Sequence, residues 1–217
     1  MTIKPILFNT EMVRAILDGR KTCTRRVIKL LENMDGIPVG KGGDSSNPLG
    51  FMYPGCIKRP QYQPGDILYV RETIWQKVGH YLDVDGETKG IFCHEYKYVA
   101  TDEKPETGWN YSWVKRPSIH MPKEAARIWL KVTDVRVERL QDITEEGAKK
   151  EGAIDNRGFI HSPDNEYDNI HTAREHFVKI WNNTIKKSNL DRYGWDASPW
   201  VWVVEFERCE KPEENRI

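Results

Sequence analysis

The chain has 217 residues, a length that favours one elaborated domain over two small ones. Its 33 basic residues balance 33 acidic ones, which excludes a protein that attracts polyanions by its overall charge, so contact with nucleic acid would need a local basic patch. The chain also lacks an apolar run of roughly 18 residues, an N-terminal secretion signal and any Cys-x-x-Cys pair, and we therefore expect a cytoplasmic protein with reduced thiols, no membrane span and no metal or cofactor.

The first predicted elements are short and well separated. Residues 3–8 are typical of a strand, and a helix capped by Thr10 is expected to stop at Asp18-Gly19. Extended chain follows over residues 23–28. The next stretch, 33–65, is rich in glycine and proline and predicts a long loop.

The second half of the chain alternates between strands and short helices. The sequence predicts a strand over 67–70, a hairpin within 72–104, an irregular segment over 101–122, an alternating strand over 127–137, a helix from Thr144, a loop over 152–168, a helix over 171–180 and a strand over 200–207. In that final strand we expect the alternating Trp200 and Trp202 to mark the core face. These elements predict an α+β domain or a small β-barrel.

The densest local charge lies just after the first helix. Arg20, Lys21, Arg25 and Arg26 occur with no acidic residue among them, which favours phosphate binding, although basic residues also guard exposed strand edges. Lys21 could take the proton of the Thr24 hydroxyl if neighbouring cations lower the pKa of the lysine. A spacing of three places the two side chains on opposite faces of a regular strand, so this pair requires a turn after Gly19.

Other candidate site residues rest on weaker patterns. Arg71 and Glu72 directly follow the strand over 67–70, where they could line a site or form a structural ion pair. Trp195 follows a glycine in a predicted loop and could stack on a base. His171 and His176 do not have the spacing of a known zinc motif, and no metal site is expected.

Four segments together resemble the ASCH domain family, which has a PUA-like β-barrel and a cleft associated with RNA or nucleoside ligands. They are Gly19-Arg20-Lys21-Thr22-Cys23-Thr24-Arg25-Arg26, Gly65-Asp66-Ile67-Leu68, the strand over 132–140, and Val203-Val204-Glu205-Phe206. The longer form here resembles the branch often encoded by phages and prophages. The resemblance implies a single domain, residues 1–217, with PUA-like β-barrel, flanking helices and insertions at about 33–64 and 76–122.

One class within that family, the bacterial N(4)-acetylcytidine amidohydrolases, uses a threonine, a lysine and a glutamate. The resemblance assigns these roles to Thr24 as nucleophile, Lys21 as base and Glu151 as the group that moves protons or orients the lysine. Glu151 follows the Leu-Gln-Asp-Ile-Thr segment that begins at residue 140. Arg20 or Arg26 would then bind substrate or stabilise the oxyanion.

Two classes of function follow from the resemblance. The protein would be a metal-independent amidohydrolase acting on an N-acylated cytidine-like nucleoside or nucleotide. The alternative is an RNA- or nucleotide-binding module, or a ribonuclease, that uses the same cleft. The oligomeric state does not follow from the sequence.

Overall fold

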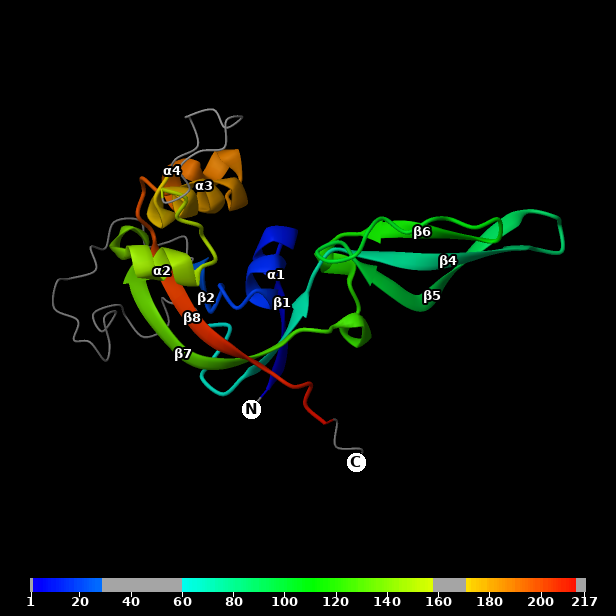
Figure 1. The fold of residues 1–217 in the computed structure, drawn as a ribbon, viewed down its shortest axis with the longest axis horizontal. Helices are drawn as coiled ribbons and strands as arrows, with labels where there is room; N and C mark the ends of the chain where they lie inside the picture. The colour runs from blue at the N-terminus through cyan, green and yellow to red at the C-terminus, as the bar shows by residue number, and fades with distance from the viewer. Residues whose placement is uncertain (1, 29–59, 158–170, 214–217) are drawn as a thin grey trace, which may run out of the picture. The chain divides into compact units, whose positions relative to one another are not determined.

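The computed structural model describes residues 2–28, 60–157 and 171–213 (Figure 1). Its strands are β1 (Ile3–Leu7), β2 (Cys23–Val27), β3 (Ile67–Arg71), β4 (Ile74–Leu82), β5 (Thr88–Tyr98), β6 (Tyr111–Arg116), β7 (Trp129–Arg139) and β8 (Trp200–Cys209). Its α-helices are α1 (Thr10–Leu17), α2 (Glu145–Lys150), α3 (Ala173–Thr184) and α4 (Leu190–Tyr193). None of the helices in these ranges is long and apolar enough to cross a membrane.

The strands form two sheets, and the protein is therefore mixed α+β, as predicted. One sheet has the strand order β1-β3-β7-β8-β2 and the other the order β5-β4-β6. Over the described residues neither sheet closes on itself, so the small closed barrel that was the other expectation is not seen there. The chain divides into two compact units that interleave along the sequence. The first unit comprises Met1–Gly19, Gly65–Lys131 and Glu207–Ile217, and the second comprises Arg20–Pro64 and Val132–Phe206.

In the first unit, β1 runs parallel to β3, and β3 pairs antiparallel with the start of β7. Helix α1 follows β1 because Asn9, rather than the predicted Thr10, caps it: the Asn9 side chain accepts a hydrogen bond from the backbone N–H of Met12. The helix buries Val13 and Ile16 on one stripe. It ends where Gly19 adopts a positive φ of 74°, which confirms the predicted stop.

The β5-β4-β6 sheet occupies most of the predicted insertion at 76–122 (Figure 1). The hairpin of β4 and β5 is confirmed, because Asp83 accepts backbone hydrogen bonds from Asp85 and Glu87 within its turn. The prediction of an irregular segment over 101–122 is wrong at Tyr111–Arg116, which forms β6 and pairs with β4. Its sequence does not alternate regularly, since Trp113 and Val114 are adjacent, and the pairing with β4 stabilises the strand where the local pattern does not predict it.

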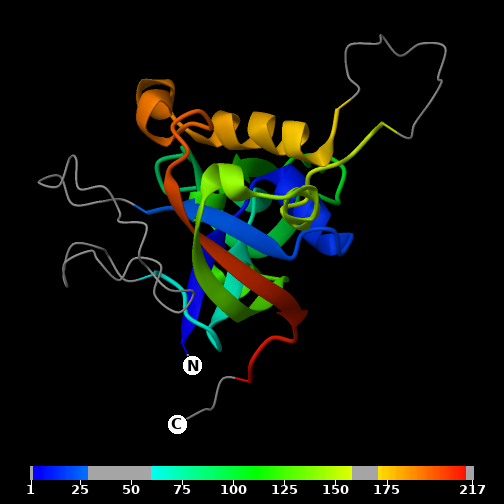
Figure 2. The same cartoon turned by 90° about the vertical axis from the view of Figure 1, so that its left-hand side faces the viewer.

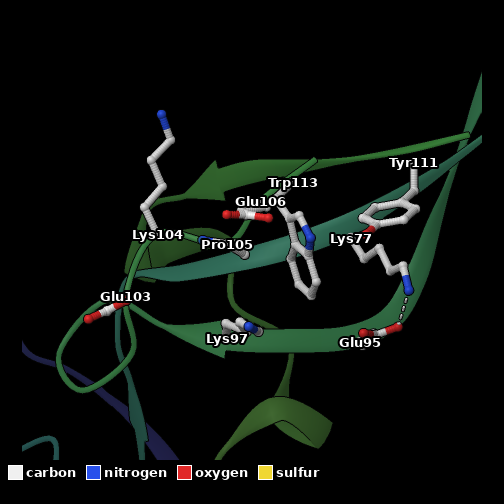
Figure 3. Close-up of a pocket in the computed structure, with 9 residues that line it drawn as sticks. All are labelled: Lys77, Glu95, Lys97, Glu103, Lys104, Pro105, Glu106, Tyr111 and Trp113. Carbon is white, nitrogen blue, oxygen red and sulfur yellow. Dashed lines mark hydrogen bonds and ion pairs between the residues drawn. The ribbon is translucent and has the colours of Figure 1, made fainter. Parts of the chain in front are cut away.

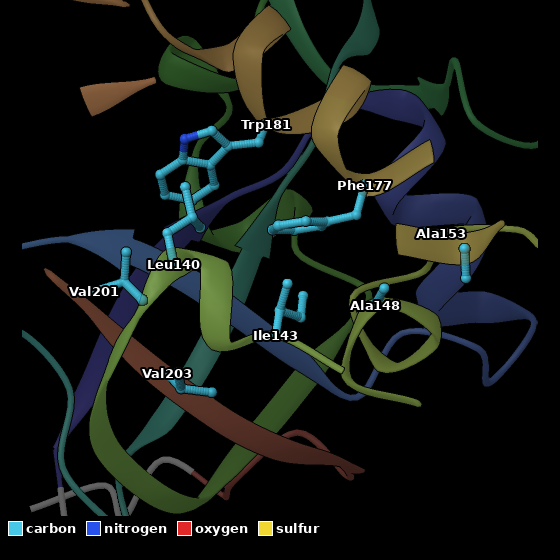
Figure 4. Packing of buried hydrophobic residues seen from close by; sticks show 9 residues of the cluster. Leu140, Ile143, Ala148, Ala153, Phe177, Trp181, Val201 and Val203 are labelled. Carbon is cyan, nitrogen blue, oxygen red and sulfur yellow. The ribbon is translucent and has the colours of Figure 1, made fainter. Parts of the chain in front are cut away.

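The second unit has its core between α3, strand β8 and the segment over 140–153 that contains α2 (Figures 2 and 4). Phe177 and Trp181 of α3 pack on Val201 and Val203 of β8. The expectation that Trp200 and Trp202 mark the core face is therefore wrong, since both are only partly buried. Alternation does not reveal which of two residue sets faces inward, and here the small valines leave room for the aromatic rings of α3.

The predicted insertion at 33–64 falls mostly on residues 29–59, which lie outside the described residues, as does most of the predicted loop over 152–168. The single-domain organisation stays a prediction.

Candidate functional site

Lys21 and Glu151, 130 positions apart in the sequence, form a buried ion pair in the second unit. The distance from Lys21 Nζ to Glu151 Oε2 is 2.6 Å, and the two side chains are 0% and 5% exposed. Lys21 Nζ also donates hydrogen bonds to the backbone oxygens of Cys23, at 2.8 Å, and of Glu151, at 2.9 Å. Three oxygens thus accept hydrogen bonds from the buried Lys21 Nζ, and this compensates for its removal from water.

Local backbone features bring these two residues together. The turn at Gly19 redirects the chain after α1, and Lys21 then forms an isolated antiparallel bridge with Glu151. Glu151 occupies the C-terminal cap of α2, a helix that Thr144 caps at its start as predicted. The main-chain bridge therefore fixes the register in which the lysine meets the carboxylate. Glu151 is itself buried.

Arg25 extends the pair into a larger network that the sequence reasoning missed. Its Nη1 lies 3.3 Å from Glu151 Oε1, and its Nη2 lies 2.9 Å from Glu138 Oε2. Arg136 continues the network, with its Nε 2.6 Å from Glu138 Oε1 and its Nη1 2.7 Å from Glu205 Oε1. A signal for Arg25 did exist: positions 21, 23 and 25 share one side of an extended chain.

Thr24 lies on β2 and is buried. In the pairing of β2 with β8 it is opposite Val204. Within the part of the chain that the structure describes, its hydroxyl forms no hydrogen bond to Lys21. The turn that this pair was expected to need is present at Gly19, yet β2 itself is a regular strand from Cys23 onward. The structure therefore places the three predicted catalytic residues in one unit and joins two of them directly.

Two further observations describe the chemistry around the ion pair. Burial, followed by the charge of Glu151, raises the pKa of the Cys23 thiol to about 12, so this thiol stays protonated and is not a nucleophile at neutral pH. Arg25 Nε is buried and, among the described residues, has no hydrogen-bond partner. An unsatisfied buried donor is rare in folded proteins and costs about 1–3 kcal/mol, and such groups are concentrated where a site meets a ligand or stores strain.

Arg20 and Arg26, the predicted substrate-binding residues of this segment, are both exposed. Arg20 Nη1 donates to the backbone oxygen of Gly152 at 3.0 Å, directly beside Glu151. The positive charge of Arg26 lowers the pKa of the nearby Tyr62, although burial is the larger influence and raises that pKa overall. Arg20 and Arg26 therefore supply accessible positive charge in the unit that holds the buried pair.

Arg71 and Glu72 lie in the first unit and have structural partners there. Glu72 is 1% exposed, and Arg127 holds its carboxylate with both Nε, at 2.9 Å, and Nη2, at 3.1 Å. Arg71 donates through Nε to the backbone oxygen of Met121 and through Nη2 to that of Ile119. Of the two interpretations left open by the sequence, the contacts favour structural roles, although Arg71 and Glu72 do not form a pair with each other.

Trp195 is partly buried against the core of the second unit. Its ring meets that of Phe177 edge-on at a centroid distance of 6.3 Å, and the Arg174 guanidinium lies 4.8 Å from its centroid. Asn182 accepts a hydrogen bond from its backbone N–H at 2.9 Å. Core packing and a stacked arginine thus explain Trp195, and no open ring face for a base is evident from these contacts.

A scan against protein-family models, a search of curated proteins and a search of solved structures each found no match to this chain. The site must therefore be interpreted from its own geometry. It offers a carboxylate 2.6 Å from a lysine nitrogen, a distance over which a proton can pass, together with a second cation 3.3 Å from the same carboxylate.

Proposed function

We propose that this protein is a metal-independent amidohydrolase that removes the acyl group from an N-acylated cytidine-like nucleoside or nucleotide, on an ASCH-type, PUA-like fold. One observation carries the proposal: the lysine and the glutamate that the family resemblance assigns to catalysis, far apart in the sequence, form a buried ion pair 2.6 Å apart. Thr24, the remaining member of the set, lies on β2 within the same unit.

In the proposed reaction the ion pair of Lys21 and Glu151 holds the proton that is transferred during catalysis. Lys21 passes one proton to Glu151 and thereby gains a lone pair, which accepts the proton of Thr24 as its oxygen attacks the acyl carbonyl. The tetrahedral intermediate then expels the cytosine amine, which takes the proton from Lys21. Lys21 then takes a proton from the water that attacks the Thr24 ester and passes it to the threonine oxygen as the carboxylic acid leaves. Glu151 finally returns its proton to Lys21, which restores the ion pair.

Cations near the pair favour such a reaction because negative charge develops on the carbonyl oxygen. Arg25 places a positive charge beside Glu151. Arg20 and Arg26 can bind the phosphate of a nucleotide substrate. Since Thr24 makes no hydrogen bond to Lys21 among the described residues, substrate binding has to bring the two together. Catalytic hydrogen bonds commonly tighten only in the substrate complex.

The test follows cytidine release from N(4)-acetylcytidine by chromatography. We expect release by the wild-type protein and a loss of about a thousandfold or more in Thr24→Val, because that variant lacks the nucleophile. Thr22→Val is the matched control: it removes an exposed hydroxyl two residues away and should keep wild-type turnover. Absence of release by the wild-type protein, or equal turnover by the two variants, contradicts the proposal.

Glu151→Gln tests whether Glu151 accepts a proton from Lys21 during the reaction. This variant should lose turnover, and it leaves Lys21 and Arg25 without their shared carboxylate, so its unfolding midpoint is measured alongside. Turnover that survives in a folded Glu151→Gln protein contradicts the role of Glu151.

A second candidate is an RNA- or nucleotide-binding module in which the pair is structural. The observation that favours it is that Lys21 Nζ already donates to three oxygens, as a structural lysine would. In that case wild-type protein releases no cytidine, Arg26→Ala weakens nucleotide binding and makes it less dependent on salt, and Glu151→Gln has little effect on affinity. Shortening of a labelled RNA would instead identify a ribonuclease.

A further inference from the structure

Along β4, the central strand of the three-stranded sheet in the first unit, one face is buried and the other is open. Ile74, Gln76 and Val78 of β4 alternate on the packed face and are buried. The residues between them point the other way, and the strand registers give their neighbours on β5 and β6. We name this open surface the aromatic–lysine face, and it consists of Trp75, Lys77, Lys97, Tyr111, Trp113 and Lys115.

Aromatic and basic side chains alternate across the strands of this face. Trp75 lies opposite Lys97 on one side and Lys115 on the other, while Lys77 lies opposite Trp113. Directly opposite residues of an antiparallel pair share a face, so these pairs are neighbours in space. The result is a surface on which each ring has an ammonium group beside it.

The distances confirm this arrangement. Lys77 Nζ lies 4.7 Å from the Tyr111 ring centroid and 6.0 Å from that of Trp113, and Lys97 Nζ lies 5.8 Å from the Trp113 centroid. A hydrogen bond to Glu95 raises the pKa of Lys77, so its charge persists at physiological pH. The rings and the cations are thus presented together.

A hollow of about 520 Å³ opens on the same face, within the size range of small-molecule sites. The indole of Trp113 stands at its middle, with Tyr111 and Lys77 on one side and Glu103 and Lys104 on the other (Figure 3). Both carboxylates and lysines line the hollow. The complete lining is Lys77, Glu95, Lys97, Glu103, Lys104, Pro105, Glu106, Tyr111 and Trp113.

We infer that the aromatic–lysine face binds single-stranded RNA, with one nucleotide seated in the hollow. Unpaired bases stack on aromatic rings regardless of sequence, and lysines beside those rings attract the phosphates that flank each base. The carboxylates of the hollow are acceptors that suit ribose hydroxyls, which DNA partly lacks.

Charge and shape together favour this partner over others. A duplex keeps its bases stacked inside, so it cannot use the rings of Trp113 and Tyr111. A purely anionic ligand would meet Glu95, Glu103 and Glu106 in the hollow, whereas a nucleotide offers a neutral base and hydroxyls there. The surface belongs to the first unit, and the inference does not rest on the hydrolysis proposed for the second.

The experiment measures fluorescence anisotropy of a labelled oligouridylate of ~16 nucleotides, the upper size of a single-strand site, with the full-length protein. We expect binding that weakens with salt, and a loss of about tenfold or more in Trp113→Ala, the effect of losing one base stack. Lys97→Gln, a change at an exposed side chain, should also weaken binding and reduce its salt dependence.

The opposite face of the same sheet supplies a matched control. Phe92 is 51% exposed there, and the Arg116 guanidinium lies 4.6 Å from its ring centroid, so the same kind of pair occurs away from the proposed surface. Phe92→Ala should bind RNA as the wild type does. Trp113→Ala should still hydrolyse free N(4)-acetylcytidine at the wild-type rate if the wild type does so, which separates this inference from the enzyme proposal.

Several outcomes would overturn the inference. The first is that the wild type does not bind RNA, and the second is that Trp113→Ala and Phe92→Ala lose the same amount of affinity. The third is that Trp113→Ala and Lys97→Gln bind RNA as the wild type does while Arg26→Ala abolishes binding. An oligodeoxyuridylate of the same length that binds equally tightly would refute the choice of RNA over DNA. Weaker DNA binding, with the difference reduced in Glu106→Gln, supports the assigned role of the carboxylates.

Discussion

Glu151 holds two cations with one carboxylate, because Oε2 faces Lys21 and Oε1 faces Arg25. Removing a charged partner from such a buried set leaves the remaining charge uncompensated, and losses of about 3–5 kcal/mol are typical. Cys23 lies between Lys21 and Arg25 in the sequence, and burial is the main cause of its raised pKa, followed by the charge of Glu151.

Cys23 provides a prediction about pH. Because burial raises the pKa of its thiol from 9.0 to about 12, the folded state holds this proton more tightly than the unfolded state. The resulting stability is fully present below about pH 9 and is lost as the pH rises towards 12. We expect the difference in unfolding free energy between wild type and Cys23→Ala to shrink over that range, measured by denaturant titration.

Alkylation followed by mass spectrometry gives a second readout. Cys23 of the folded protein should react with iodoacetamide far more slowly than the partly buried Cys93 at the same pH. Equal rates for the two cysteines would show that Cys23 is not shielded as the structure has it.

The motif that contains Lys21 and Thr24 led to Glu151 through a family resemblance. The structure brings Lys21 and Glu151 into contact, and their catalytic roles stay a prediction. Arg25 and Glu138 could not be joined in advance because their contact depends on how β2 and β7 are placed in the folded unit, which no local pattern encodes. Arg71 and Glu72 are neighbours in sequence, yet each has its own partners elsewhere in the first unit.

Among the elements, α3 shows how a helix terminus and a core depend on each other. Thr172 accepts a hydrogen bond from the backbone N–H of Glu175 at 3.0 Å, and the Glu175 carboxylate accepts one from the backbone N–H of Thr172 at 2.7 Å. This reciprocal cap fixes the first turn, in which Ala173 is fully buried. Phe177 follows one turn later and packs in the core of the second unit.

Thr172→Ala should therefore lower the free energy of unfolding by about 1 kcal/mol, the usual cost of losing a threonine cap. Thr172→Ser retains the hydroxyl and should remain close to wild type. Denaturant titration of the three proteins measures both effects. If serine and alanine destabilise equally, the hydroxyl contributes nothing to the helix.

Element boundaries followed from sequence where capping and turn residues mark them. Asp18-Gly19 ends α1, Thr144 begins α2, and the turn that contains Asp83 and Gly86 joins β4 to β5. Strand β6 was missed because its order comes from pairing with β4 rather than from its own pattern. The two tryptophans of β8 were assigned to the core wrongly for a related reason, since α3 packs on Val201 and Val203, which alternate with them.

For the whole molecule, the central question is whether two units with separate cores unfold together. In the first unit the buried Glu72 pairs with the partly exposed Arg127, and the Arg127 guanidinium also lies 3.9 Å from the Tyr98 ring centroid. Strands β7 and β8 each run without a break from one unit into the other. A continuous strand is hard to melt at only one end, and we therefore expect one cooperative transition.

Glu72→Gln tests this expectation, because it removes the charge that holds Arg127. We expect a loss of about 2 kcal/mol, smaller than for a fully buried pair since Arg127 is partly exposed, and a shift of the entire transition. Far-UV circular dichroism and tryptophan fluorescence should give the same midpoint before and after the change. Two separated steps, of which only one moves, would show that the units unfold independently.

The interleaved order of the units has a consequence for synthesis on the ribosome. Lys21 emerges early, but the carboxylate that neutralises it emerges 130 residues later, and strand β8, which pairs with β2, later still. The nascent chain must therefore carry a solvated lysine and an unpaired β2 through most of translation. Chaperones that hold unfolded chains would have longer access to this protein than to one whose units are completed in turn, and neither unit can be obtained by simple truncation.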